Sequence, residues 1–449
     1  MMNKIVDFIK KNLFYTLVIL SIVLVIQVLQ RTLGINIIEL GRWLMSEGTG
    51  GTIISHVKFF FILIWIMGLI YSRNLMKSSA LYRWFFILLL PLGMYFWNVK
   101  TRVFPIYELA KERGEKVGKV YVNDDVLGYK QTPFSRGYRL LGDKDIIIQH
   151  DDKGYRIPIG YQHPKEPVGA LTLGCSVSYG DACWAENTFA YLLSKKTSTD
   201  YINASVSGNG LSQMVINAEK IIPEKHPKYA IVQYSSWLAN RSMTYYQKFL
   251  GGKFPIPYFS DKGLEEPVFS PKGLSAPLGA FRYTPKNTWD FLKFYLRVSP
   301  YVMYQDFQSL WVSFKASLGF VNKPSVDRDK VEEYGYDRIY QVCKKNNTKM
   351  ILWTTGTGFS VPSKLPPASV LNNPDIIKVY IDSLAMRLHP TTNLMDYQKI
   401  YGHWYLPKGS KDSVFADGHP NNYMHSLIAD EIYKNMRTYE QANLPKTVQ

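Results

Sequence analysis

The chain has 449 residues, enough to bury a full core without disulfide or metal staples and, at usual domain sizes, to form about three units. Its three cysteines (Cys175, Cys183 and Cys343) show no CxxC or Cys/His metal spacing, so we predict neither a disulfide scaffold nor a structural metal. The formal net charge of +17 is scattered among aromatic and proline residues without a basic run. This pattern disfavours nucleic acid as a partner and favours an anionic membrane face or envelope polymer.

Three apolar runs within residues 1–103 predict an N-terminal helical transmembrane segment. The runs are Leu13–Leu29, Phe59–Tyr71 and Trp84–Trp97, and the last two need flanking residues to reach the ~20 residues of a span. Long buried core helices are the alternative, which the absence of a polar face disfavours. Lys and Arg residues before the first run and between the second and third predict a cytoplasmic N-terminus, with everything after about Arg102 outside the cytoplasm.

Residues 104–168 change to short β-prone pieces separated by turn residues. Val120–Val122, Tyr138–Leu141 and Ile146–Ile148 are such pieces, and Asp151–Gly154 is one of the turns between them. We predict a β-rich lead-in that packs on the main domain as a strap and completes its core.

Residues 169–440 alternate between strand and helix patterns. The predicted strands are 170–173, 201–204, 229–234, 350–353 and 376–381, and the predicted helices are 211–222, 331–344 and 424–436. Such alternation predicts a parallel sheet with helices on both faces. Its ligand site is then expected beyond the carboxyl ends of the strands.

The alternation fails at about residues 242–323, which are crowded with Tyr, Phe, Trp, Pro and Lys. An insertion of this size without a regular pattern is typical of a lid or binding surface, or of a subdomain that pattern reading does not resolve. Aromatic residues with interleaved Lys suit sugar faces and acidic groups. They suit a small core or a membrane-facing surface equally well.

A serine follows the first predicted strand of this domain at a Gly-framed turn, Gly174-Cys175-Ser176. A turn from a strand into a helix exposes a short side chain beside backbone N–H groups that no helix hydrogen bond uses. Ser176 is therefore a candidate nucleophile, although a purely structural turn has the same pattern.

A serine nucleophile needs a base, and the base needs a partner that fixes its tautomer. Asp417-Gly418-His419 precedes the last helix and can place a carboxylate against one imidazole nitrogen. The alternative is a surface turn in which Asn421 or Asn422 caps that helix. A third turn, after the second strand, contains Gly208, whose bare backbone N–H can approach an oxyanion.

Together, the three turns resemble the blocks of the SGNH hydrolases, also called the GDSL esterase/lipase superfamily. Gly174-Cys175-Ser176 is similar to the first block, with Cys where the commonest form has Asp. Asn203–Gly208 resembles the second block and Asp417–Asn421 the last, in the same order and at similar spacing. The resemblance covers about residues 169–436.

The resemblance implies a flavodoxin-like α/β/α sandwich of the SGNH hydrolase type. It implies Ser176 as nucleophile, His419 as base and Asp417 as the residue that orients the base. The backbone N–H groups of Ser176 and Gly208 would hold the oxyanion.

The third block departs from the family pattern. The family usually has Gly-x-Asn-Asp, whose Asn is the remaining oxyanion donor, whereas this chain has Ser235–Arg241 with Trp237 in the Asn position. Asn240 or Arg241 could substitute if the loop is rearranged, and we take Asn240 as the candidate oxyanion donor. The departure indicates either a specialised site or a degenerate one.

The predicted function is a membrane-anchored, extracytoplasmic SGNH-type serine esterase or O-acyltransferase. Its substrates would be acyl esters, acetyl foremost, of a cell-envelope polysaccharide or glycan. Water as acceptor gives an esterase and a sugar hydroxyl gives a transferase. We expect no cofactor and no metal, and the expected partners are the lipid bilayer, the acylated saccharide and, as a candidate, a membrane acyltransferase. The alternative is a catalytically degenerate SGNH-fold protein that binds glycan or helps to assemble an envelope machine.

Overall fold

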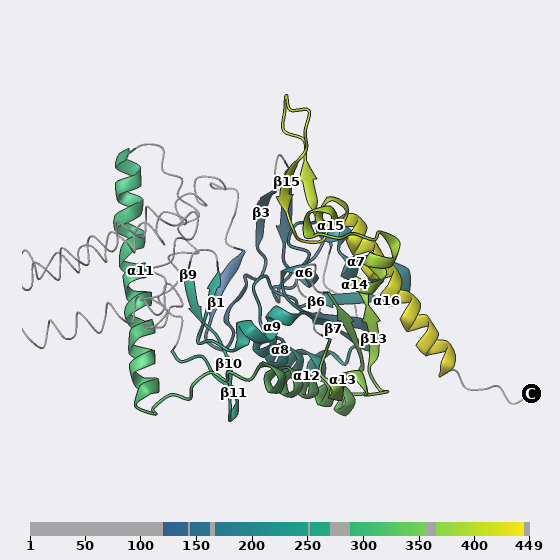
Figure 1. Ribbon diagram of the computed structural model, residues 1–449, viewed down its shortest axis with the longest axis horizontal. Coiled ribbons are helices and arrows are strands. Elements are labelled where there is room, and N and C mark those ends of the chain that lie inside the picture. Colours follow the sequence, from purple (N-terminus) through teal and green to yellow (C-terminus); the bar gives the residue numbers. More distant parts are fainter. Residues whose placement is uncertain are drawn as a thin grey trace, which may run out of the picture. The chain divides into compact units, whose positions relative to one another are not determined.

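The computed structural model describes residues 120–141, 144–161, 167–249, 252–269, 288–355 and 365–443 (Figure 1). The chain divides into two compact units, Met1–Thr101 and Arg102–Gln449, and every described residue belongs to the second. None of the helices in the described ranges combines the length and apolar character that a membrane crossing requires. The three predicted spans lie outside these ranges and stay predictions.

A five-stranded parallel sheet forms the centre of the described unit. Its strands are β5 (Val168–Leu173), β6 (Asp200–Asn203), β7 (Tyr229–Tyr234), β12 (Lys349–Thr354) and β13 (Ile377–Tyr380). They lie in the order β13-β12-β7-β5-β6. Counted along the chain, this is the flavodoxin-like order 2-1-3-4-5. The predicted flavodoxin-like parallel α/β fold is therefore confirmed.

Sequence explains why β7 is central. All six of its residues are buried, five of the six are apolar or aromatic, and none is charged, as expected for a parallel strand covered on both faces. At the sheet edge, the strand predicted over 376–381 ends at Tyr380, because Ile381 begins a helix.

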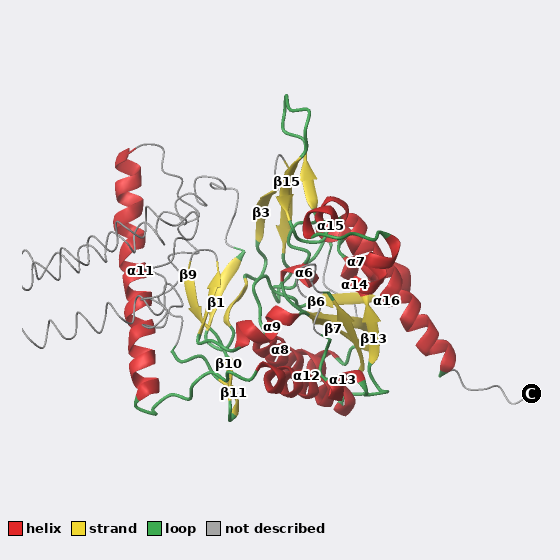
Figure 2. Cartoon of the chain, in the orientation of Figure 1, coloured by secondary structure: helices red, strands yellow, loops and turns green. Residues whose placement is uncertain are grey.

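Helices cover both faces of the sheet (Figure 2). They are α7 (Phe189–Thr197), α8 (Leu211–Lys225), α12 (Arg328–Lys345), α14 (Ile381–Leu388) and α16 (Asn422–Ala442). Helix α8 packs on α12, and α7 packs on α16. Their apolar faces and the sheet form one large buried core, which includes Trp353 and Phe189.

The lead-in, predicted only as β-rich, forms two antiparallel hairpins. They are β1 (Tyr121–Asp124) with β2 (Gly128–Gln131), and β3 (Arg136–Leu141) with β4 (Lys144–Gln149). Tyr129 and Ile148 join Tyr179, Val206 and Phe254 in a second buried cluster, which is separate from the main core.

The region at about 242–323, where the sequence shows no regular pattern, does contain regular elements. Two hairpins occur there, β8 (Tyr246–Phe249) with β9 (Gly252–Pro255) and β10 (Tyr258–Ser260) with β11 (Gly263–Glu265), followed by the 30-residue helix α11 (Thr288–Ser317). The strands have only three or four residues, too few for a clear alternating pattern. The helix contains a proline and many aromatic residues, which are poor helix signals.

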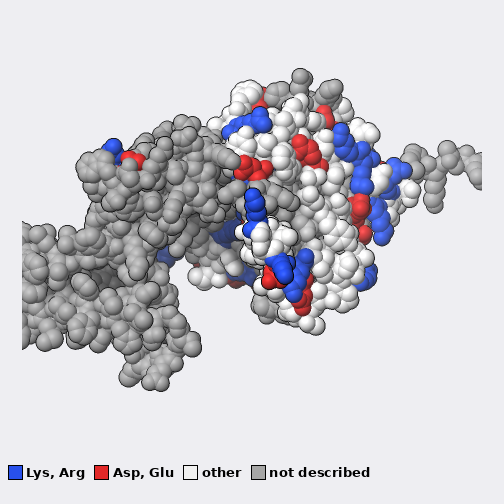
Figure 3. Space-filling model, turned by 90° about the horizontal axis from the view of Figure 1, so that it is seen from above, with Lys and Arg blue, Asp and Glu red and all other residues white. Residues whose placement is uncertain are grey.

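The remaining elements are short. They are α6 (Ser176–Tyr179), η3 (Ala185–Asn187), α9 (Ser236–Ser242), α13 (Ala368–Leu371), α15 (Leu394–Tyr401), β14 (His403–Tyr405) and β15 (Val414–Asp417). On the face seen in Figure 3, Lys and Arg side chains lie in separate groups with Asp and Glu among them. This distribution resembles the scattered charge of the sequence more than a continuous basic surface.

Candidate active site

Ser176 is the first residue of α6 and stands just beyond the carboxyl end of β5. Cys175 precedes it in an extended conformation as the N-cap. Gly174 has to be glycine, because a Cβ there would lie 2.3 Å from Ser178 Oγ and 2.5 Å from Gln233 Oε1. The turn thus lets the backbone pass close to the neighbouring strand and presents the serine at the rim of the sheet.

Gln233, near the end of β7, holds this turn in place. Its side-chain oxygen accepts hydrogen bonds from the Cys175 backbone N–H at 3.1 Å and from Ser178 Oγ at 2.9 Å. Its amide nitrogen donates to Ser235 Oγ at 2.8 Å. Because Gln233 is fully buried, losing it would leave several buried polar groups unpaired.

The acid–base pair comes from the end of β15. Asp417 is the last residue of this strand, and its Oδ1 accepts a hydrogen bond from the backbone N–H of His419 at 2.7 Å. The same oxygen is hydrogen-bonded to His419 Nδ1. This contact fixes the imidazole with its other nitrogen directed away from the carboxylate.

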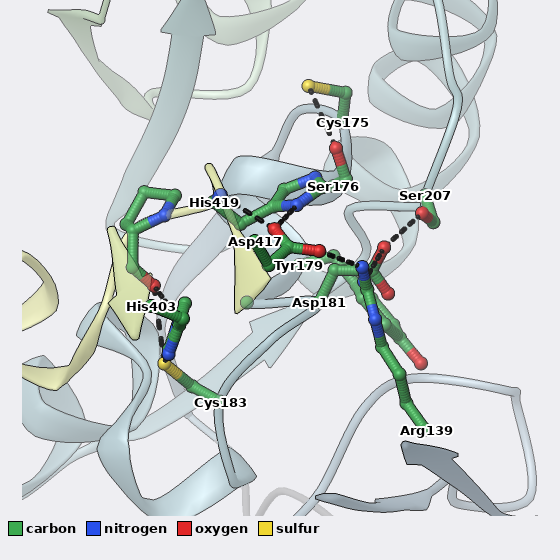
Figure 4. Close-up of polar contacts among 12 residues, drawn as sticks. Arg139, Cys175, Ser176, Tyr179, Asp181, Cys183, Ser207, His403, Asp417 and His419 are labelled. Carbon is green, nitrogen blue, oxygen red and sulfur yellow. Dashed lines mark hydrogen bonds and ion pairs between the residues drawn. The ribbon is translucent and has the colours of Figure 1, made fainter. Parts of the chain in front are cut away.

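In Figure 4 the His419 imidazole lies between Ser176 and Asp417 in the view, with a dashed line to the Asp417 carboxylate and none to Ser176. The Ser176 hydroxyl points toward Cys175 Sγ at 3.9 Å, and the residue is 8% exposed. Catalytic hydrogen bonds are often loose without substrate and tighten when it binds. Asp417 and His419 follow Ser176 by more than 240 positions in the sequence. The fold brings all three predicted residues to one region of the structure.

The electrostatics keep the Asp417 carboxylate ionised. Partial burial by itself would raise its pKa, but the contacts with His419 and with the Arg139 guanidinium outweigh burial and hold the pKa well below its usual range. An ionised carboxylate at this place can stabilise an imidazolium as it forms.

Other contacts fix the loop that carries His419. His403 on β14 donates from Nε2 to the Pro420 carbonyl at 3.0 Å, and Cys183 Sγ contacts the same carbonyl at 3.3 Å. Asn421 caps α16 by accepting from the backbone N–H of Met424 at 3.0 Å. The capping role weighed as an alternative for this turn is therefore present together with the Asp417–His419 pair.

The second predicted block, Asn203–Gly208, contacts the first block, Gly174–Ser176. The backbone N–H of Val206 donates to the Gly174 carbonyl at 3.2 Å, which ties this loop to the nucleophile turn. Gly208 has φ of +83°, a conformation that favours glycine. The Tyr129 hydroxyl donates to the Ser207 carbonyl at 3.0 Å, so the lead-in holds the loop from its other side. The oxyanion role of Gly208 stays a prediction.

The atypical third block forms α9. Asn240 is exposed on this helix, and Trp237 packs half-buried against the main core. Arg241 donates to the Asn209 carbonyl at 3.2 Å, so it holds the second block. The oxyanion role proposed for Asn240 stays a prediction.

Several site residues escaped the sequence analysis. Arg139 forms ion pairs with Asp417 and Asp181, and Ser207 Oγ donates to Asp181 Oδ2 at 2.8 Å. Arg139 gives no local signal, because its partner Asp417 lies 278 positions away. Asp181 does lie near the Gly174 turn, and its position directly after that motif could have drawn attention to it.

Within the described ranges, no group of three or more His, Cys, Asp or Glu side chains is placed to hold a metal ion. The chemistry that the described residues support is acyl transfer, because a hydroxyl, an imidazole and an ionised carboxylate occupy one region.

No protein-family model matches the chain, and no curated protein matches its sequence. Solved structures do match parts of it. They include a putative lipolytic protein of the G-D-S-L family from Desulfitobacterium hafniense, at 8% identity and TM-score 0.29, covering 59% of this chain and 98% of that one. An esterase from Pseudoalteromonas sp. matches at 13% identity and TM-score 0.31, covering 61% and 98%.

A third match is a two-domain esterase active on acetylated mannans, at 13% identity and TM-score 0.32. It covers 61% of this chain and 50% of that one. The fold follows from its strand order, and the candidate site follows from its own contacts.

Proposed function

We propose that this protein is a membrane-anchored, extracytoplasmic serine esterase or O-acyltransferase of the SGNH hydrolase type. Its substrates are acyl esters, acetyl foremost, of a cell-envelope polysaccharide or related glycan. The observation that carries the proposal is the Asp417–His419 hydrogen bond beside Ser176, at the carboxyl end of β5 (Figure 4).

In the proposed reaction, Ser176 Oγ attacks the ester carbonyl carbon while His419 takes the hydroxyl proton. The carbonyl oxygen becomes an oxyanion and accepts hydrogen bonds from the backbone N–H groups of Ser176 and Gly208. The intermediate collapses, the bond to the leaving alcohol breaks, and His419 returns the proton to that alcohol. An acyl group then remains on Ser176 Oγ.

The second half of the reaction decides the class of enzyme. If water attacks the acyl-enzyme, His419 takes its proton and the free acid leaves. If a sugar hydroxyl attacks, the acyl group passes to the glycan. Incubating the protein with a labelled acyl donor, with and without glycan acceptor, separates the two outcomes by whether the label appears in free acid or in glycan.

A serine-directed phosphonate probe tests the proposal. Wild-type protein should become covalently labelled, and Ser176→Ala should remove the labelling completely. His419→Gln should slow it by about 10²- to 10⁴-fold, because the hydroxyl loses its base. Ser410→Ala is the control: this exposed serine lies between β14 and β15, and its replacement should keep the wild-type labelling. Labelling that survives in Ser176→Ala would refute the assignment.

The alternative is a glycan-binding or assembly protein with a degenerate site. It is favoured by the third block, where Trp237 packs against the core and Asn240 is exposed on α9. Folded wild-type protein that takes no label but binds acetylated envelope polysaccharide would support this alternative.

A further inference from the structure

Arg139 links the segments of the candidate site. It comes from strand β3 of the lead-in, in a part of the chain that precedes the α/β domain. Its guanidinium lies between two carboxylates, contacting Asp181 Oδ2 at 2.5 Å and pairing with Asp417 Oδ2 (Figure 4). The three side chains are only 13 to 14% exposed.

Asp181 joins this guanidinium to the nucleophile turn and to the second block. Its backbone N–H donates to the Ser176 carbonyl at 3.1 Å. Its Oδ2 also accepts from Ser207 Oγ at 2.8 Å, next to Gly208. Arg139, Asp181 and Asp417 therefore form a continuous connection from the candidate nucleophile to the carboxylate that orients His419.

The ion pairs keep Asp181 ionised and Arg139 protonated although both side chains are largely buried. Burial by itself would raise the pKa of Asp181, but Arg139 and, to a smaller extent, His419 and Ser207 hold that pKa below its usual value. For Arg139, burial would lower the pKa, and the two carboxylates raise it instead. The connection thus consists of one cation between two anions. A lysine could not contact both carboxylates with the same fork geometry.

We propose that Arg139 is a positioning residue of the active site, which holds the acid–base turn against the nucleophile turn and shares the charge of Asp417 with His419. This inference rests on the proposed function. Through Arg139, the lead-in would help to position the catalytic residues in addition to its packing role.

The charge of Arg139 should affect how the reaction rate depends on pH. The groups facing His419 are Asp417 on β15, Asp181 after α6, His403 on β14 and His425 on α16. Burial lowers the pKa of both neighbouring histidines, to about 3 for His425, so they are neutral near pH 7. Without Arg139, Asp417 and Asp181 would lose a cation that lowers their pKa, while burial would still raise it. The Asp417 carboxylate would then take up a proton at higher pH and no longer stabilise the imidazolium.

The test uses the full chain in detergent and hydrolysis of p-nitrophenyl acetate. Arg139→Gln should lower kcat by roughly 10- to 100-fold, with KM nearly unchanged, because a misplaced base affects the transition state more than substrate binding. The acidic limb of its pH–rate profile should move to higher pH. Arg136→Gln, at an exposed arginine on the same strand, should keep the wild-type rate and profile.

Arg139→Lys should recover part of the rate and of the pH profile, since it retains a cation but not the two-sided contact. If Arg139→Gln fails to fold, Arg139→Lys decides the question by the same two readouts. A folded variant with wild-type kcat and an unmoved profile overturns the inference alone. Wild-type protein that neither hydrolyses the ester nor takes the phosphonate label overturns the proposed function, and this inference with it.

Discussion

Single residues set the shape of the nucleophile turn. Glycine is needed at Gly174 because Ser178 and Gln233 leave no room for a Cβ, and at Gly180 because φ is +76°. Arg156 then closes the turn, as its buried guanidinium donates to the carbonyls of Tyr179, Gly180 and Cys183. The two glycines are visible in the sequence, but the arginine contacts are not.

Gly180→Ala should be strongly destabilising. A Cβ there would lie 2.3 Å from Thr188 Cγ2, so overpacking adds about 1 to 3 kcal/mol to the backbone strain of about 1 kcal/mol. Gly160→Ala is the matched control, since Gly160 has φ of +73° with nothing within 4 Å. Urea unfolding followed by circular dichroism measures both. Equal losses of stability would show that Thr188 does not restrict the turn.

At the scale of elements, short connections carry the candidate chemistry and regular elements hold them. Helix α16 begins at Asn422, directly after the turn that carries His419. Asn421 caps this helix and also donates to the carbonyls of Ile400 at 2.8 Å and Gly402 at 2.9 Å. One side chain thus fixes both the helix start and the position of the turn.

Asn421→Ala should lower the free energy of unfolding by about 2 kcal/mol or more, because a cap and two further hydrogen bonds are lost. It should also slow phosphonate labelling of Ser176. Asn393→Ala removes the exposed cap of α15, where the side chain accepts from Asp396, and should cost about 1 kcal/mol without changing the labelling rate. If the two variants label at the same rate, the Asn421 contacts do not position His419.

At the scale of the whole molecule, the lead-in and the α/β domain share buried polar contacts. His150 in the lead-in is hydrogen-bonded to the Tyr179 hydroxyl at 2.8 Å and to Ser135 Oγ at 2.8 Å. His425 on α16 is fully buried, and its Nδ1 accepts from the backbone N–H of Phe189 at 3.3 Å. Burial lowers the pKa of both histidines to about 3.

These histidines predict acid sensitivity. Their ordinary pKa is 6.5, so between pH 6.5 and about 3 the unfolded chain binds protons that the folded chain does not. The contribution of each neutral histidine to the free energy of unfolding is therefore fully present above pH 6.5. Below that pH it is lost by about 1.4 kcal/mol per pH unit for each histidine. His150→Gln should reduce the slope of unfolding free energy against pH by that amount. An unchanged slope would contradict the buried neutral state of His150.

The predicted topology places the α/β domain outside the cytoplasm. Val326 is 93% exposed, whereas Cys175, Cys183 and Cys343 are buried. In intact cells, a membrane-impermeant maleimide should therefore label Val326→Cys and leave wild-type protein unlabelled. Labelling that appears only after the cells are lysed would place the domain in the cytoplasm.

The sequence by itself determined the α/β class, the β-rich character of the lead-in and the three turns that carry Ser176, Gly208 and the Asp417–His419 pair. It could do so because strand and helix periodicity and Gly-framed turns are local patterns. The helix α11 was missed, since its composition weakens the helical pattern.

Only the tertiary structure decided that Arg139 pairs with Asp417 and Asp181, and that Gln233 holds the nucleophile turn. Asp181 lies 42 positions after Arg139, Asp417 lies 278 positions after it, and Gln233 lies 58 positions after Cys175. The order of the parallel strands brings Gln233 next to the nucleophile turn, and the placement of the hairpins β3–β4 and β14–β15 brings Arg139 to Asp417. No pattern within a short stretch of sequence contains either arrangement.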